Sequence, residues 1–272
     1  MKRLLLILTS LVALAASAAE GMDSVAVRPE RPVTSVYTFG IGTAHVVDTY
    51  LSPIRYEGTH YALGYERWQA MRARPEDLVM RLGFGLEFDD THNQVRNATM
   101  LTGMLRAEWG MYRRWRLPSS MTVAVGGSTS LDAGVNYLSR NGNNPVAAKA
   151  AWTVNLTGLY QWRSRLGRLP FTFSYRPTLP LLGAFFSPDY GELYYEIYLG
   201  DTSGLAHCAW PGNYRGLDQS FSLDLHLGRT TLRLGYDCRL LTTRANNITA
   251  NRATHAFVVG ISTTTLSLMG SE

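Results

Sequence analysis

The chain has 272 residues, with 26 lysines and arginines against 21 aspartates and glutamates, and its formal net charge is +5 at pH 7. A leader that carries Lys2 and Arg3 would take two of these positive charges with it, which leaves a net charge of +3. This small excess is not gathered in a block, so the composition gives no reason to expect a nucleic-acid partner.

The first residues predict export. Lys2 and Arg3 are followed by an apolar stretch over residues 4–16 and by the small-residue sequence Ala16-Ser17-Ala18. This arrangement is typical of a secretory signal peptide. We expect residues 1–19 to be removed, with an uncleaved membrane anchor as the alternative. Residues 20–32 are polar and contain two prolines, and are predicted to be a flexible periplasmic lead-in to a β-barrel over residues 33–270.

The segment from Leu78 to Asp89 carries the clearest structural pattern. Every second residue from Leu78 to Phe88 is large and apolar, whereas the residues between them are mostly small or charged. Successive side chains of a β-strand point to opposite faces of the sheet. The segment is therefore predicted to be a strand whose apolar face meets lipid, with Arg81, Glu87 and Asp89 in the lumen.

The same alternation predicts ten strands. They are expected over residues 33–46, 56–70, 78–89, 99–112, 120–133, 149–163, 169–179, 219–227, 230–241 and 253–269. Most exceed the roughly 5–6 residues of a soluble strand and suit a tilted membrane strand of about 9–11 residues. Charges fall almost entirely on one face, as lipid requires. The pattern favours an all-β, antiparallel transmembrane β-barrel over a soluble β-sandwich.

The connections between these segments predict the topology. Four are short, at residues 72–77, 113–119, 164–168 and 228–229, and they alternate with longer polar segments at 47–55, 90–98, 134–148, 180–218 and 242–252. Bacterial barrels have short periplasmic turns and long extracellular loops. The alternation indicates ten strands with both ends of the barrel chain in the periplasm. An extra hairpin over residues 192–199 would make twelve strands, which is the alternative.

Charged residues of both signs occupy the inward positions of the predicted strands. They are Glu66, Arg81, Glu87, Arg106, Glu108, Arg163, Arg176, Asp224, Arg233, Asp237 and Arg239. A ten-stranded barrel has a narrow interior, so we expect these charges to form a salt-bridged plug without a wide pore. A pore would instead favour a lumen biased to one sign of charge.

One pair of inward residues resembles a catalytic pair. Asp224 and His226 share a strand face, as the Asp-x-His pair of the omptin proteases does, and Asp89 and Asp90 would supply a second acidic pair. A carboxylate beside an imidazole is the arrangement that activates water as a base. However, the strand that carries His226 ends at the short turn 228–229, far along the barrel from Asp89. We therefore favour paired lumen charges over a catalytic site.

Other enzyme signatures are weaker. Outer-membrane phospholipase needs a serine two residues after a histidine, and none of the six histidines is followed in this way. No set of His, Cys, Asp and Glu residues has metal-ligand spacing. We expect neither a metal nor another cofactor.

The two cysteines, Cys208 and Cys238, are candidates for a disulfide because an exported protein meets oxidising conditions. Two free, buried thiols are the alternative, since the geometry of the bond cannot be read from spacing.

The long segment 180–218 is the remaining place for a binding function. It is rich in aromatic residues, namely Phe185, Phe186, Tyr190, Trp210 and Tyr214. Exposed loop aromatics can bind an extracellular ligand or a partner protein. The alternative is that they fold down and cap the barrel.

Several stretches resemble a family of exported proteins from gut anaerobes of the Bacteroidetes, known as domain of unknown function 3316. The resembling stretches are residues 50–58, 194–198, 203–207 and 224–236. The resemblance implies an outer-membrane location in a Gram-negative bacterium and no established activity, so it assigns no functional residue.

Together these patterns predict a ten-stranded outer-membrane barrel, embedded in outer-membrane lipid, that presents binding loops and has no catalytic activity. A lipid- or peptide-hydrolysing enzyme and a narrow channel are the alternatives.

Overall fold

The structure is a computed structural model that describes residues 32–142, 144–189, 194, 199–200, 204–228 and 230–266. The predicted signal peptide and lead-in lie outside these residues, except for Pro32, with which the first strand begins. Among the described residues, no helix is long and apolar enough to cross a membrane. The strands are β1 (Pro32–Asp48), β2 (Ser52–Ala70), β3 (Leu78–Asn93), β4 (Thr99–Leu117), β5 (Met121–Leu138), β6 (Val146–Leu166), β7 (Leu169–Phe186), β8 (Ala206–Ala209), β9 (Tyr214–Leu227), β10 (Thr230–Ala245) and β11 (Ile248–Leu266).

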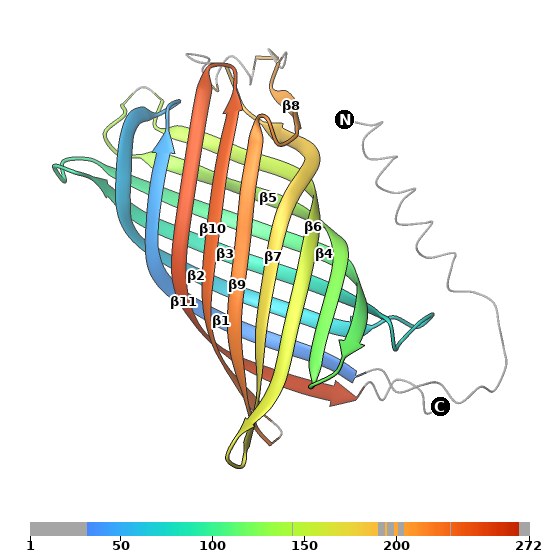
Figure 1. The fold of residues 1–272 in the computed structure, drawn as a ribbon. Coiled ribbons are helices and arrows are strands. Elements are labelled where there is room, and N and C mark those ends of the chain that lie inside the picture. Colours follow the sequence, from blue (N-terminus) through green and yellow to red (C-terminus); the bar gives the residue numbers. More distant parts are fainter. Residues whose placement is uncertain are drawn as a thin grey trace, which may run out of the picture. The chain divides into compact units, whose positions relative to one another are not determined.

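Ten of the strands in the described chain close into an antiparallel barrel (Figure 1). β1 to β7 pair in chain order, β7 pairs with β9, and β11 returns to pair with β1. β8 pairs with the end of β7 and is not part of the closed wall. The predicted ten-stranded barrel is confirmed. The hairpin that would have made twelve strands falls on residues 192–199, of which only Tyr194 and Leu199 lie within the described residues.

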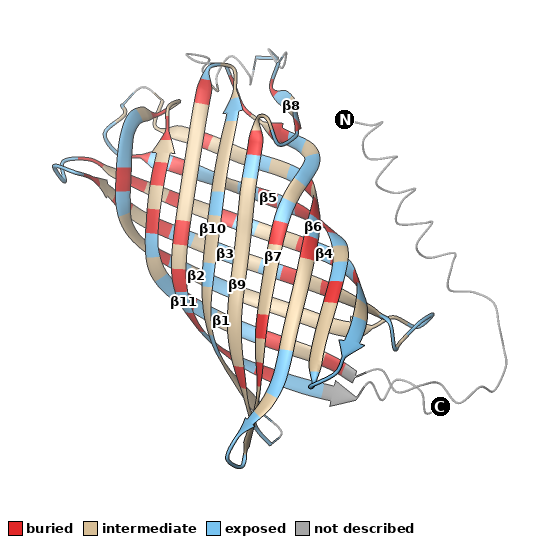
Figure 2. Cartoon of the chain, viewed as in Figure 1, coloured by how far each residue is buried: buried red, intermediate tan, exposed pale blue. Residues whose placement is uncertain are grey.

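The two faces of β3 follow the predicted alternation. Phe84, Leu86 and Phe88 point outward and are 51%, 48% and 44% exposed, whereas Arg81 and Asp89 point into the barrel and are 5% and 0% exposed. Figure 2 shows the same alternation of buried and exposed positions along the neighbouring strands. The prediction that the apolar face of this strand is the outer one is therefore confirmed.

An apolar belt runs round the outside of the barrel. The cross-strand register links one outward position on each of the ten wall strands into a row that follows the stagger of the strands and does not close on itself, because Ala133 pairs with Ala150 and Trp162 with Met121 across β5 and β6. Its members are Ala133, Leu105, Leu86, Leu63, Phe39, Val259, Leu234, Leu223, Phe173 and Trp162. The row contains no polar residue. A closed wall with such a belt suits a hydrocarbon environment, in which backbone groups must be paired within the protein.

The two ends of the barrel are distinguished by the ends of its first and last strands. The terminal end is the one at which β1 starts and β11 ends, and the far end is the opposite one. At the far end several strands run beyond their predicted limits: β7 continues to Phe186 and β10 to Ala245. In β10 the added residues 242–245 are mostly polar, and in β7 the added stretch begins at Pro180 and contains one extra residue, so the regular apolar alternation stops before either strand does.

The longer strands shorten the connections at the far end. The predicted long loops 47–55 and 242–252 are wrong, because the strands there are joined by residues 49–51 and by Asn246-Asn247. Both asparagines adopt positive φ values, 50° and 58°. Asparagine tolerates this region, which a tight two-residue hairpin turn requires. The predicted loop 180–218 is likewise reduced to residues 187–213, which include β8.

Candidate functional site

A first group of ion pairs fills the lumen near the terminal end, and we call it the lower network. Glu66 on β2 lies at its centre, 2.6 Å from Arg81, 3.0 Å from Arg176 and 3.4 Å from Arg233. Arg233 also holds Asp224 through two hydrogen bonds of 2.7 and 2.8 Å. Its members are Glu66, Arg81, Glu108, Arg176, Asp224 and Arg233.

A second group, the upper network, lies nearer the far end. Arg239 contacts Asp132 at 2.8 Å, Glu87 at 3.2 Å and Asp218 at 3.4 Å. Arg252 donates two hydrogen bonds to Asp89, at 2.8 and 3.0 Å. The members are His60, Glu87, Asp89, Arg106, Asp132, Asp218, Arg239 and Arg252.

The two networks join strands from opposite sides of the wall and divide the lumen. Arg239 on β10 reaches Asp132 on β5, and Arg176 on β7 reaches Glu66 on β2. A cavity of about 170 Å³ lies between the networks, one of about 280 Å³ lies toward the terminal end, and one of about 70 Å³ lies toward the far end. Buried charges are tolerated in such a lumen because each has an opposite charge beside it.

Nine of the eleven predicted lumen charges take part in these ion pairs. Among the described residues, Arg163 and Asp237 do not. Asp237 lies across from Ser220 on β9 and lines the central cavity. Arg163 is exposed at the rim of the terminal end, where it lines the cavity of about 280 Å³.

Asp224 and His226 do not act on each other. The Asp224 carboxylate is held by Arg233, and the His226 ring hydrogen-bonds to Thr172 at 2.8 Å and Thr231 at 3.0 Å. Both histidine nitrogens are therefore occupied by hydroxyl groups. This geometry gives the pair a role in filling the barrel and leaves no ring nitrogen free to activate water.

The structure instead pairs His60 with Asp89, which the sequence reasoning did not connect. The His60 Nδ1 atom lies 2.6 Å from the Asp89 Oδ1 atom, and Arg252 holds the same carboxylate. His60 and Asp89 face each other across β2 and β3. Both residues had inward parity in the sequence, and a known register for these strands would have joined them. Among the described residues, no hydroxyl or thiol group hydrogen-bonds to His60, and the Asp89 carboxylate is shared between His60 and Arg252.

Two members of the upper network, Asp218 and Arg252, were missing from the predicted lumen charges because they fell in predicted loops. His60 and Asp132 were also missing from that set, although both lay on the inward faces of predicted strands. The strands that carry Asp218 and Arg252 extend beyond the apolar pattern that predicted them. Extending the alternation from the apolar part of each strand would have placed Asp218 and Arg252 at inward positions.

Of the two alternatives for Cys208 and Cys238, the structure has both thiols free, but Cys208 is exposed and Cys238 is only partly buried. Cys208 lies on β8, beside Ala184 at the end of β7. Cys238 lies in the wall, between Gln219 and His255. The strand pairing that fixes each cysteine holds them in different parts of the barrel.

The predicted loop aromatics separate into two groups. Phe185 and Tyr214 are buried inside the far end, with ring centroids 5.5 Å apart, whereas Trp210 is 58% exposed. Phe185 points inward because β7 contains one extra residue opposite Val154 and Asn155, which reverses its parity. Phe186 lies at the end of β7 and lines the adjoining cavity, and Tyr190 lies outside the described residues.

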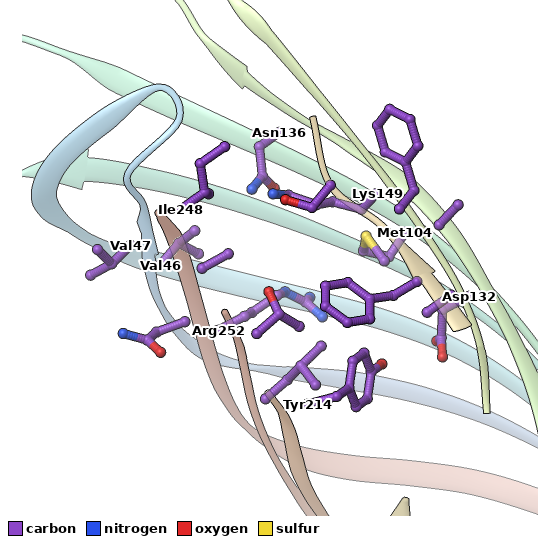
Figure 3. A pocket seen from close by; sticks show the side chains of 18 of the residues that line it. Val46, Val47, Met104, Asp132, Asn136, Lys149, Tyr214, Ile248 and Arg252 are labelled. Carbon is purple, nitrogen blue, oxygen red and sulfur yellow. The ribbon is translucent and has the colours of Figure 1, made fainter. Parts of the chain in front are cut away.

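The cavity of about 70 Å³ opens at the far end, and we call it the mouth pocket (Figure 3). It lies between two apolar clusters inside the barrel. Val46 belongs to the cluster that β1 to β6 form, and Phe185 and Tyr214 belong to the other. Met104 and Ile248 complete the apolar lining.

Charged residues also line the mouth pocket. They are Lys149, Arg239, Arg252 and Asp132, and each of the three cations is paired with a carboxylate. The Lys149 ammonium lies 2.7 Å from the buried Asp48 carboxylate, which also accepts a hydrogen bond from Asn136 at 2.8 Å. Small-molecule sites commonly are apolar cavities with a few fixed polar groups and often lie in barrel mouths, with volumes of about 300–1,000 Å³, so the mouth pocket has this chemistry at a smaller size.

The barrel, its outer apolar belt and its charged lumen define the outer-membrane type of β-barrel protein. The family model described as "Protein of unknown function (DUF3316)" matches residues 3–272, so the chain belongs to this family. No curated protein matches the chain.

Solved structures with a similar fold include several outer-membrane proteins. The outer membrane protease OmpT from Escherichia coli is 5% identical, with a TM-score of 0.49, over 89% of this chain and 99% of that chain. The translocator domain of the autotransporter NalP from Neisseria meningitidis is 11% identical, with a TM-score of 0.39, over 94% and 93%. An outer membrane channel from Pseudomonas putida F1 is 9% identical, with a TM-score of 0.36, over 91% and 100%.

Proposed function

We propose that this protein is an outer-membrane β-barrel of a Gram-negative bacterium that binds a small amphipathic ligand in its mouth pocket, without catalysis. The far end would face the outside of the cell and the terminal end the periplasm. Residues 1–19 would be removed as a signal peptide during export. The resemblance found in the sequence also points to a member of the Bacteroidetes as the source.

The single observation that carries the proposal is the mouth pocket itself. Its walls come from β1, β4, β5, β6, β7, β9, β10 and β11, so closure of the barrel brings residues far apart in the sequence together in one pocket. Apolar side chains such as Val46 and Tyr214 would take the apolar part of a ligand. Lys149 and Arg252 would favour an anionic group at its other end.

The lumen gives less support to the two alternative functions. An enzyme would need a nucleophile or an activated water beside a base, whereas both ring nitrogens of His226 are hydrogen-bonded to threonine hydroxyls and the Asp89 carboxylate beside His60 is also held by Arg252. A channel would need a continuous lumen. The ion pairs of Arg239 and Arg233 instead cross the barrel at two levels.

Phenylacetate is a suitable probe of the mouth pocket because it joins one aromatic ring to one carboxylate. Full-length barrel in lipid nanodiscs would be titrated with phenylacetate and, as a matched control, with phenylethylamine, which has the same ring and the opposite charge. We expect phenylacetate to bind more tightly. Lys149→Gln should weaken phenylacetate binding about fivefold, in line with the loss of one charge-assisted hydrogen bond.

A second pair of variants tests the position of the site. Ala151 points into the mouth pocket, so Ala151→Phe should fill the pocket and abolish binding. Ala133→Phe adds the same group to the outer face of β5, where Ala133 is exposed, and should leave binding unchanged. Equal affinities for the two aromatic probes, together with no effect of Ala151→Phe, would overturn the proposal.

A further inference from the structure

The terminal end of the barrel differs from the far end in its charge. Its turns and strand ends carry eight arginines and two carboxylates among the described residues. The arginines are Arg72, Arg74, Arg113, Arg114, Arg116, Arg163, Arg165 and Arg168, and the carboxylates are Glu76 and Asp77. An excess of one charge around a cavity with low-dielectric walls concentrates ions of the opposite sign.

The largest lumen cavity opens toward this rim. It measures about 280 Å³, and we call it the terminal cavity. Arg114 and Arg163 line it next to the rim, and the lower network closes it on the inner side. Hydroxyl groups line much of the remaining wall, from Thr34, Thr172, Ser174, Ser220, Ser222, Thr231, Ser262 and Thr264.

The two rim arginines are not neutralised by carboxylates. Among the described residues, the Arg163 guanidinium makes no ion pair or hydrogen bond. Arg114 donates to the backbone carbonyls of Glu76 at 2.8 Å and Pro75 at 3.2 Å, so the turn between β2 and β3 fixes its position. Arg114 is therefore a positioned cation without a counter-charge in contact.

A buried hydroxyl group supplies an independent observation. Tyr112 lines the terminal cavity and is 0% exposed, and its hydroxyl group has no hydrogen-bond partner in the described part of the chain. Its ring packs against Trp68 at a centroid distance of 5.4 Å, which fixes where the hydroxyl points. A buried hydroxyl without a partner costs free energy, so such a group commonly marks the place of a ligand or an ordered water.

We propose that the terminal cavity is a binding site for a phosphate-bearing anion. Arg163 and Arg114 would bind the phosphate oxygens through charge-assisted hydrogen bonds, and the Tyr112 hydroxyl would donate a further one. The hydroxyl-rich wall suits a hydrophilic phosphate ester. Two sources share this chemistry, a free phosphate ester and the headgroup of an anionic phospholipid. The site is at the opposite end of the barrel from the mouth pocket and does not depend on it.

Calorimetric titration of the full-length barrel in phosphatidylcholine nanodiscs tests the proposal. The probes are inorganic phosphate and glucose 1-phosphate, with neutral glucose as the control. We expect both anions to bind and glucose not to bind. Arg163→Gln and Tyr112→Phe should each weaken anion binding by about tenfold or more, in line with the loss of one hydrogen bond to a charged group.

The matched control is Arg140→Gln, which removes an equally exposed arginine from the loop at the far end and should leave affinity unchanged. Arg163 is exposed, so its substitution leaves folding intact even if Tyr112→Phe does not. The proposal is overturned if the wild type binds neither anion up to about 10 mM, or if Arg163→Gln and Arg140→Gln bind alike.

Nanodiscs that also contain phosphatidylglycerol separate the two sources of the anion. Competition from this lipid, seen as weaker apparent binding of inorganic phosphate to the wild type but not to Arg163→Gln, identifies a lipid headgroup. Unchanged affinity identifies a free phosphate ester. Both results support the anion site and differ in the ligand they assign.

Discussion

At the scale of single residues, the lumen depends on a few carboxylates that each serve more than one arginine. Glu66 is the clearest case, since Arg81, Arg176 and Arg233 all lie within 3.4 Å of it. These partners come from strands β3, β7 and β10. One side chain therefore joins distant parts of the wall, and its loss would leave buried guanidinium groups with fewer counter-charges.

Glu66→Gln should lower the free energy of unfolding by about 3–5 kcal/mol, the usual effect of removing one partner from a buried ion pair. Urea unfolding of the barrel in lipid vesicles, followed by the migration of folded and unfolded protein on gels, measures this. Glu57→Gln is the control: Glu57 pairs with Arg55 at 2.7 Å on the outer surface, and exposed pairs contribute about 0–1 kcal/mol. Equal effects of the two substitutions would contradict a structural role for the lower network.

At the scale of elements, one strand carries both environments. β3 presents Leu86 to the outside and Glu87 to the lumen, so adjacent residues meet opposite demands. This explains why its alternation is so regular in the sequence. The alternation therefore carries no information about function, because lipid and the lumen charges require the same pattern whatever the barrel binds.

Leu86→Arg should lower stability by about 2–4 kcal/mol if the belt lies at the middle of the bilayer. Val95→Arg, in the connection between β3 and β4, is the control, since Val95 is 72% exposed and such surface changes stay within about 0.5 kcal/mol. Unfolding in vesicles measures both variants. A harmless Leu86→Arg would show that the belt does not face lipid.

The turn between β10 and β11 gives a second test at this scale. Asn246 and Asn247 both adopt left-handed backbone conformations. Replacing both by alanine should cost about 1–2 kcal/mol, because this conformation is unfavourable for residues with a β-carbon and alanine lacks the local hydrogen bonding of asparagine. Asn247→Gly should retain stability, since glycine suits the turn. Thermal unfolding of the two variants distinguishes a tight turn from the longer loop that the sequence predicted.

At the scale of the whole molecule, the barrel is a closed wall around a lumen that two ion-pair networks divide. The networks contain both signs of charge and span the wall from side to side. We expect wild-type protein in planar bilayers to show no steady single-channel conductance. Reproducible conductance steps from folded protein would contradict this and favour the channel alternative.

The alternation of residues by itself determined the number of wall strands, the outward face of each and most of the inward charges. Lipid selects for an apolar side chain at each outward position, so these features can be predicted from the sequence without knowing which strands pair. The sequence did not predict how far the strands continue beyond the apolar belt, and for that reason Asp218 and Arg252 were missed as lumen residues.

Only the tertiary structure decided which inward groups meet. The pairing of His60 with Asp89, the separation of Cys208 from Cys238 and the inward turn of Phe185 all depend on register or on one extra residue in β7. Register comes from the closure of the barrel, in which each strand position is fixed by two neighbours at once. The mouth pocket and the terminal cavity arise in the same way, because their walls combine strands that are far apart in the sequence.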